Sequence, residues 1–129
     1  MNKIFVCLAI SLCVLHGRAQ HYEKISEKFL QFYNAQAPDS LFNLYNPALQ
    51  EKLPLEKTKA VLSGLHVQYG DLKSLSLLKQ DSGFNMYKAG FAHQTLTLLL
   101  SLDSEDLIEG YRLVPYSADR FPEEKIKRK

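Results

Sequence analysis

Hydrophobic positions recur along this chain with two different periods, and the change falls near Gly70. Before Gly70 the apolar residues return every three or four positions, which is the period of a helix that buries one face. After Gly70 they alternate with polar residues, which is the period of a half-buried strand. The pattern therefore predicts an α+β domain in which N-terminal helices pack on a sheet formed by the second half.

Three helices are expected before this change. The stripe of the first, over residues 21–36, consists of Tyr22, Ile25, Phe29, Phe32 and Tyr33. Pro38 should end it, and Asp39 or Ser40 should cap a short second helix by accepting its free amide protons. Pro54 suits the first position of a third helix, which Gly70 should end in a left-handed conformation.

Four strands are expected after Gly70, joined in an antiparallel meander. They cover residues 74–77, 84–93, 95–102 and 107–114, with turns at 80–83 and 103–106. Gly110 should mark a bulge that brings Ile108 onto the same side as Tyr111 and Leu113. A curved sheet covered by helices on one face often leaves a conical apolar cavity, and such cavities bind small molecules.

The first nineteen residues have the pattern of a secretory signal peptide. Lys3 precedes an apolar run over residues 4–15, and small residues at Gly17 and Ala19 predict cleavage after Ala19. The run is too short to span a membrane, which takes about 20 apolar residues. We therefore expect a secreted or periplasmic bacterial protein without stable membrane insertion. Both cysteines, Cys7 and Cys13, would leave with the signal peptide, so neither a disulfide nor a cysteine metal site is expected.

Charge argues against a nucleic-acid ligand. Without Lys3 and Arg18, the 16 basic residues become 14 and balance the 14 acidic ones. Nucleic-acid binders usually have a basic surplus or stripe. Here only residues 125–129 form a basic run, which we interpret as part of a solvated tail over residues 117–129.

Several short motifs resemble a known family. They are Leu-Pro-Leu-Glu-Lys-Thr at 53–58, Gly-Leu at 64–65, Tyr-Gly at 69–70, Ser-Leu-Asp at 101–103, Ile-Glu-Gly at 108–110 and Pro-Tyr at 115–116. In this order, after a signal peptide, they resemble a small accessory domain of unknown function. That domain precedes secreted bacterial serine hydrolases related to β-lactamases. The resemblance covers residues 22–116.

The resemblance implies a nuclear transport factor 2-like (cystatin-like) fold over a single domain, residues 20–116. It implies a non-catalytic role, because the hydrolase nucleophile would lie in a following domain. The tail resembles the linker into such a domain, so the chain is expected to be either a stand-alone version or a truncated hydrolase. A hydrolase domain or a second copy of the chain is the implied partner.

Candidate chemistry is sparse. Ser76 and Lys79 match an S-x-x-K pattern, but in a strand their side chains should point to opposite faces. No histidine has a second ligand at metal-binding spacing, so neither metal nor cofactor is expected. His93 and Glu109 are the conceivable acid–base pair of a small cofactor-free isomerase or hydrolase.

A binding role is the leading hypothesis. We expect Tyr69, Tyr87 and Tyr111, with His93 at the cavity mouth, to line a site for a small apolar or peptide-like ligand. No residue is assigned a catalytic role under this hypothesis.

Overall fold

Helices precede strands along the chain as predicted, but the described residues form four helices rather than three, because Asn46 and Pro47 divide the predicted second helix into two. The computed structural model describes residues 20–81 and 83–118. The proposed signal peptide and residues 119–129 of the tail lie outside them. After a first helix over residues 20–34, the elements are α2 (Pro38–Phe42), α3 (Pro47–Lys52), α4 (Leu55–Tyr69), β1 (Leu72–Gln80), β2 (Asn85–Phe91), β3 (Thr95–Leu102) and β4 (Ile108–Pro115). The fold is α+β, as predicted.

Proline and glycine set most of the helix boundaries. Gly70 ends α4 with φ of 80°, as predicted, and a side chain there would press on Ala92 and His93 at about 3 Å. Pro54 immediately precedes α4. The predicted cap of α2 is wrong, because its N-cap residue is Ala37 and no side chain caps the helix. Since proline at the first helical position has no N–H to satisfy, Pro38 starts α2 and leaves Asp39 and Ser40 inside it.

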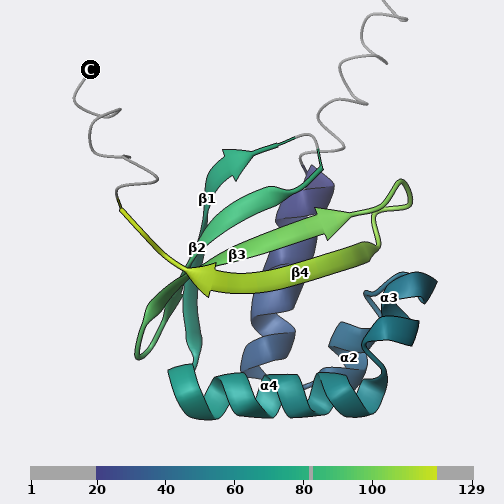
Figure 1. Ribbon diagram of the computed structural model, residues 1–129, viewed down its shortest axis with the longest axis horizontal. Helices are drawn as coiled ribbons and strands as arrows, with labels where there is room; N and C mark the ends of the chain where they lie inside the picture. The colour runs from purple at the N-terminus through teal and green to yellow at the C-terminus, as the bar shows by residue number, and fades with distance from the viewer. Residues whose placement is uncertain (1–19, 82, 119–129) are drawn as a thin grey trace, which may run out of the picture.

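The sheet is an antiparallel meander with strand order β1-β2-β3-β4 (Figure 1). Its third hairpin contains the predicted bulge. Ser101 pairs with Gly110 and Leu102 pairs with Ile108, so Glu109 is the extra residue. The side chain of Ile108 is consequently buried in the core.

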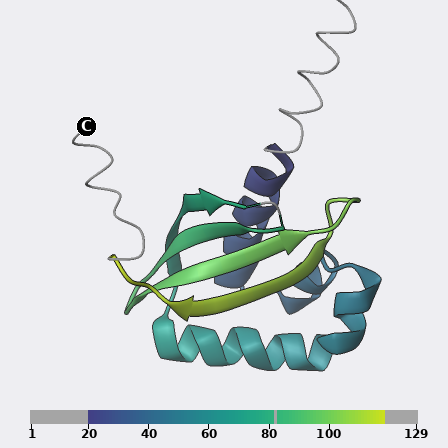
Figure 2. The ribbon, with the colours of Figure 1, turned by 45° about the horizontal axis from the view of Figure 1, so that its top comes forward.

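All helices lie on one side of the sheet, and α4 runs below its lower edge (Figures 1 and 2). Buried residues alternate with less buried ones along β2, and the same face of β3 is buried throughout. The core residues are Tyr22, Phe29, Tyr33, Leu41, Tyr45, Leu49, Leu62, Leu72, Tyr87, Ala89, Phe91, Leu96, Leu98, Leu100, Leu102 and Ile108. A single core joins the helices to the inner face of the sheet.

The first helix crosses the sheet diagonally. Near its start, the Tyr22 hydroxyl accepts a hydrogen bond from the Leu102 amide at 3.1 Å, which places it over the end of β3. Near its end, the Asn34 side chain both accepts from the Leu72 amide (2.8 Å) and donates to the Leu72 carbonyl (2.9 Å) at the start of β1. The helix therefore covers the beginning of β1 and diverges from its far end.

Within the part of the chain that the structure describes, no helix is long and apolar enough to cross a membrane.

Candidate functional site

A groove of about 360 Å³ opens between the first helix and the far end of β1. Figures 1 and 2 show the start of this helix beside the β1–β2 hairpin. The groove is lined by Tyr22, Glu23, Ser26, Glu27, Leu75, Leu77, Gln80, Asn85 and Tyr87. Its walls combine apolar side chains of a strand, a polar floor and two carboxylates. Ligand-binding pockets commonly have such a lining, with a few polar groups among apolar ones.

The path of the first helix explains why the groove exists. The register places Leu72, Leu75 and Leu77 opposite Phe91, Ala89 and Tyr87, so all three face the helical layer. Leu72, which the end of the helix covers, is buried. Leu77 lies where the helix has diverged, and 51% of it remains exposed. A large apolar side chain is thus left uncovered on the inner face of the sheet.

The floor of the groove is polar although it belongs to the core face. Tyr87 and Asn85 are only 5% and 3% exposed, and the Asn85 amide group donates to the Tyr87 hydroxyl at 3.2 Å. Burial raises the pKa of Tyr87 above its ordinary value, and hydrogen bonds with Asn85 and Ser26 oppose this increase only in part. The Tyr87 hydroxyl is therefore neutral at physiological pH.

The Asn85 side chain uses only part of its hydrogen-bonding capacity. Its amide nitrogen has a partner, but its oxygen Oδ1 accepts no hydrogen bond from the described residues. Among the described residues the only buried side-chain polar atom without a partner is Thr97 Oγ1, so Asn85 Oδ1 is accessible from the groove and can accept from a ligand N–H.

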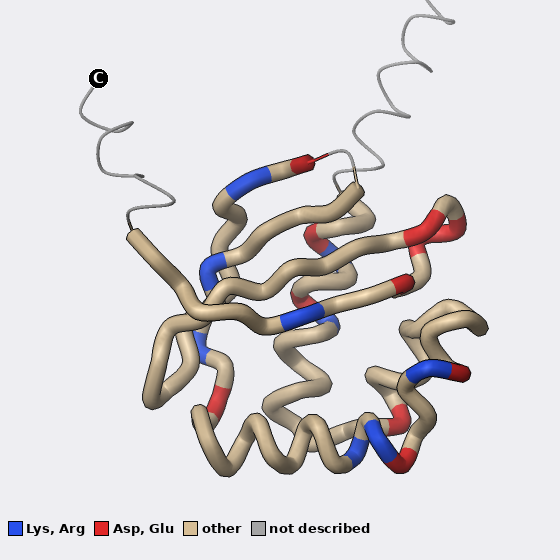
Figure 3. The backbone as a smooth tube through the Cα atoms, in the orientation of Figure 1, with Lys and Arg blue, Asp and Glu red and all other residues tan. Residues whose placement is uncertain are grey.

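The carboxylates of the groove come from the first helix. Glu23 and Glu27 are one turn apart, both are exposed, and neither forms an ion pair with another described residue. Figure 3 shows acidic (red) and basic (blue) positions following one another along that helix. Lys24 and Lys28 do not line the groove. The charge that faces its opening is negative.

The four predicted ligand-binding residues do not converge on one cavity. Tyr87 lines the groove, whereas Tyr69 packs against Phe91 with ring centroids 5.6 Å apart. His93 is exposed in the turn after β2, where its amide donates to the Tyr69 carbonyl at 3.0 Å. The predicted second strand is accordingly too long at its end, because β2 stops at Phe91.

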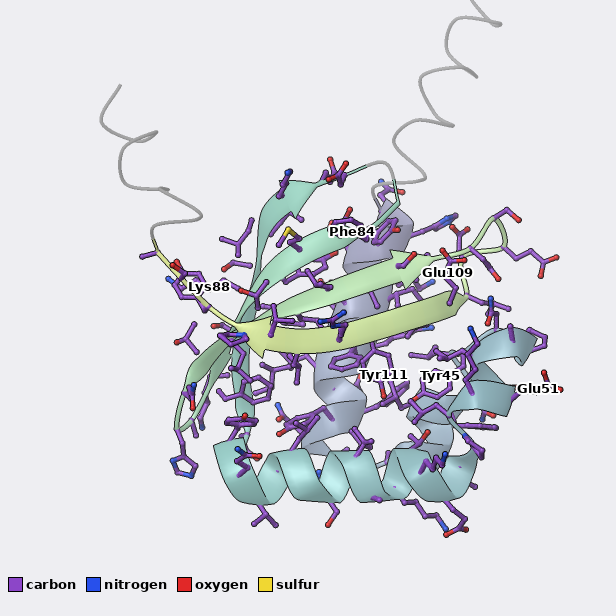
Figure 4. The ribbon with its side chains drawn as sticks, viewed as in Figure 1. Tyr45, Glu51, Phe84, Lys88, Glu109 and Tyr111 are labelled. Carbon is purple, nitrogen blue, oxygen red and sulfur yellow. The ribbon has the colours of Figure 1, made fainter. Side chains whose placement is uncertain are left out.

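Tyr111 belongs to a separate buried network beside β4 (Figure 4). Its hydroxyl lies 2.7 Å from that of Tyr45, which also accepts from Thr58 at 3.2 Å. The Tyr111 ring packs edge-on against Phe29. Burial raises the pKa of Tyr111, and the Tyr45 hydroxyl adds to this effect. The network ties α4 and the segment before α3 to the sheet, so its function is structural.

His93 and Glu109 lie at opposite ends of the sheet. His93 is just before the start of β3, whereas Glu109 accepts a hydrogen bond from Ser101 near the end of that strand at 2.6 Å. The stretch of β3 between them spans about 20 Å, at roughly 3.3 Å per residue. A general acid and base must both reach the same substrate atoms within hydrogen-bond distance. The structure does not bring these two together.

Ser76 and Lys79 lie on the same face, contrary to the simple strand argument. A bulge at Leu78 shifts the register, so they are opposite Lys88 and Met86, which share the outer face of β2. Lys79 is 3.7 Å from Asp81 in an ion pair. Both Ser76 and Lys79 are exposed, and neither lines the groove. The arrangement does not create a nucleophile site.

Sequence reasoning missed most of the groove. Asn85 interrupts the apolar alternation of β2, and Ser26 occupies a buried position of the first helix. Polar residues at positions predicted to face the core are the sequence signal that was available. Glu23, Glu27 and Gln80 carry no such signal, because exposed polar residues are common on helices and strand ends.

Among the described residues, no group of three or more histidine, cysteine or acidic side chains is arranged to hold a metal ion. A scan against protein-family models found no match, and searches of curated proteins and of solved structures found none either. The resemblance to the accessory domain therefore stays a prediction.

Proposed function

We propose that this chain is an exported, non-catalytic binding module that holds a small apolar or peptide-like ligand in the groove between the first helix and β1. The observation that carries the proposal is Leu77. It faces the core side of the sheet yet is half exposed, directly beside the buried floor of Asn85 and Tyr87. A ligand that covered Leu77 would gain hydrophobic stabilisation and could form hydrogen bonds with the floor at the same time.

A non-catalytic role is supported by the separation of His93 from Glu109. The two carboxylates of the groove lie on an exposed helix surface. A proton-transferring carboxylate normally acts from a desolvated position that holds it in the required protonation state. The arrangement favours binding over acid–base chemistry.

The chain has no tryptophan, which allows a direct test. A Leu77→Trp variant places one indole in the groove, and a Val67→Trp variant places one on α4, where Val67 is 83% exposed and remote from the groove. Titration with a short peptide that alternates leucine and serine should shift the fluorescence of the first variant to shorter wavelength. The second variant should not respond. Equal responses, or none in either, would contradict the proposal.

Export is part of the proposal and rests on the pattern in residues 1–19. N-terminal sequencing of protein recovered from the periplasm or medium of a bacterial host should find Gln20 first. The resemblance adds a hydrolase domain or a second copy as the larger partner of residues 20–116. Light scattering of the exported protein measures self-association directly. A strictly monomeric protein would exclude a second copy as the partner and leave the hydrolase domain.

A further inference from the structure

We propose that the ligand of the groove is an extended peptide segment that carries a lysine or arginine beside an apolar side chain. This inference rests on the proposed function and specifies its ligand. It follows from three features of the groove: unpaired carboxylates, an unpartnered acceptor in the floor, and an open strand edge.

The carboxylates of the groove differ from others on the surface in standing together at one opening. They do not differ in lacking partners, because Glu51 and Glu105 also have no ion pair among the described residues. Asp106 pairs with His21 at 2.6 Å, Asp71 with His66 at 2.7 Å, and Glu56 with Lys59 at 3.6 Å. Glu23 and Glu27 have no such partner among the described residues, although they stand side by side at one opening. No basic residue of the described chain lines the groove. A cation from outside would reduce the repulsion between the two carboxylates.

The floor also offers an accessible acceptor. Asn85 Oδ1 lies on a side chain that is 97% buried and has no hydrogen-bond donor among the described residues. A lysine ammonium has three N–H donors and no acceptor, and an arginine guanidinium has five. Either group can donate to Asn85 while it interacts with Glu23 or Glu27, and the carbon stem of the same side chain can cover Leu77.

The edge of β1 favours a peptide over a small amine. β1 is the first strand of the sheet and pairs only with β2, so no described strand covers its other edge. Asn34 occupies the backbone groups of Leu72, so the edge beyond this residue is left without a described partner. An extended segment can pair with such an edge and place alternate side chains in the adjacent groove.

Two bulges limit how long that pairing can be. The register shifts between Leu72 and Ser74, and again between Leu77 and Lys79, so only residues 74–77 form a regular stretch. Bulges and lysines on an edge also discourage pairing between copies of the same protein. A short pairing gives little specificity of its own, so the cationic and apolar side chains in the groove must determine which peptide binds.

The test compares two fluorescein-labelled peptides by anisotropy, one alternating leucine with lysine and one alternating leucine with glutamate. The protein should bind the lysine peptide at least tenfold more tightly than the glutamate peptide, because the carboxylates of the groove attract lysine and repel glutamate. Affinity for the lysine peptide should fall as salt is raised to about 1 M, where the Debye length is roughly 3 Å.

Variants assign this preference to the groove. Glu23→Gln with Glu27→Gln should weaken binding of the lysine peptide about tenfold and remove most of its salt dependence, because each exposed pair contributes modestly. The matched control is Glu51→Gln with Glu105→Gln, which removes two exposed carboxylates outside the groove and should leave affinity within twofold. In Figure 4, Glu51 lies on α3, on the far side from β1.

Each outcome decides a different claim. Equal affinity for the two charged peptides, with the leucine–serine peptide still bound at Leu77, would overturn the cation preference and leave the proposed function intact. Failure of every peptide to bind would overturn both. Full competition by hexylamine at the same concentration as the lysine peptide would show that the amine alone is recognised, and would contradict the extended-peptide part.

Discussion

The two edges of the sheet are finished in different ways. At β4, the segment before α3 adds a parallel bridge between Tyr45 and Ile108, with the Asn46 amide donating to the Ile108 carbonyl and the Ile108 amide donating to the Leu44 carbonyl, both at 2.8 Å. Tyr45, which forms this bridge, also places its hydroxyl 2.7 Å from that of the partly buried Tyr111. At β1, Asn34 alone among the described residues occupies the backbone, and only at Leu72.

This difference shows that tyrosine has different roles at the two edges. Tyr45 and Tyr111 satisfy one another and hold α4 and β4 together, so they offer nothing to a ligand. Tyr87, on the second strand from the open edge, directs its hydroxyl toward Asn85 in the floor of a groove. Each edge has backbone hydrogen bonds from outside the sheet at one described residue, Ile108 of β4 and Leu72 of β1. The closed edge is therefore the start of β4 at Ile108, where the tyrosines are paired with one another, and the open edge is β1 beyond Leu72, where Tyr87 lies at a groove.

The largest expected effect is at the closed edge. Tyr45→Ala removes a buried ring that packs against Phe42 and Tyr111, and should lower the free energy of unfolding by about 3–5 kcal/mol. Its counterpart at the open edge, Leu77→Ala, should cost less than about 1 kcal/mol because the side chain is already half exposed. Urea denaturation of both variants checks the comparison. Similar losses would mean that the two edges are equally closed.

High pH should act on the core between the edges. Burial raises the pKa of Tyr33 to about 12, with a smaller contribution from Asp71. Because the folded protein holds this proton more tightly than the unfolded chain, Tyr33 stabilises the fold fully below pH 10, and this stabilisation is lost between pH 10 and about 12. Two pKa units correspond to about 2.7 kcal/mol.

Denaturant titrations at pH 9 to 12 measure this loss as a decline of the unfolding free energy. Tyr33→Phe should be less stable at pH 9, since it loses the 2.8 Å hydrogen bond to the Gly70 carbonyl, and should decline less steeply above pH 10. An unchanged slope in the variant would assign the alkaline loss to other residues.

A smaller effect is expected where Asn34 protects the start of β1. Asn34→Ala removes two hydrogen bonds to Leu72 and should cost about 1–3 kcal/mol. It should also speed amide exchange at Leu72, because the N–H group loses its partner. The control is Asn43→Ala, because Asn43 is exposed and lies outside the sheet. It should change the free energy of unfolding by no more than about 0.5 kcal/mol and leave exchange at Leu72 unchanged. Slow exchange at Leu72 in Asn34→Ala would contradict this role.

Local signals in the sequence were sufficient for the order of the elements. Gly70 marks the end of α4, because its positive φ suits glycine. Gly110 marks the bulge in β4, where the register with β3 shifts. The first strand was predicted over residues 74–77 but extends over Leu72–Gln80. The bulges near Lys73 and Leu78 interrupt the alternation and so conceal the ends of the strand.

The candidate site was less predictable. The amphipathic stripe of the first helix shows which face it buries, but not the diagonal along which it crosses the sheet. That diagonal follows from tertiary contacts, Tyr22 with Leu102 and Asn34 with Leu72, between residues far apart in the chain. It alone determines that Leu77 is uncovered and that Tyr87 lies in a groove while Tyr111 does not.

The most direct test of the account is amide chemical-shift mapping of the wild-type protein titrated with the leucine–lysine peptide. We expect the largest shifts along the open edge, at Leu75, Leu77, Asn85 and Tyr87, with little change at Ile108 on the closed edge. Shifts centred on β4 and the segment before α3 would show that the ligand uses the other edge and would contradict the assignment of the groove.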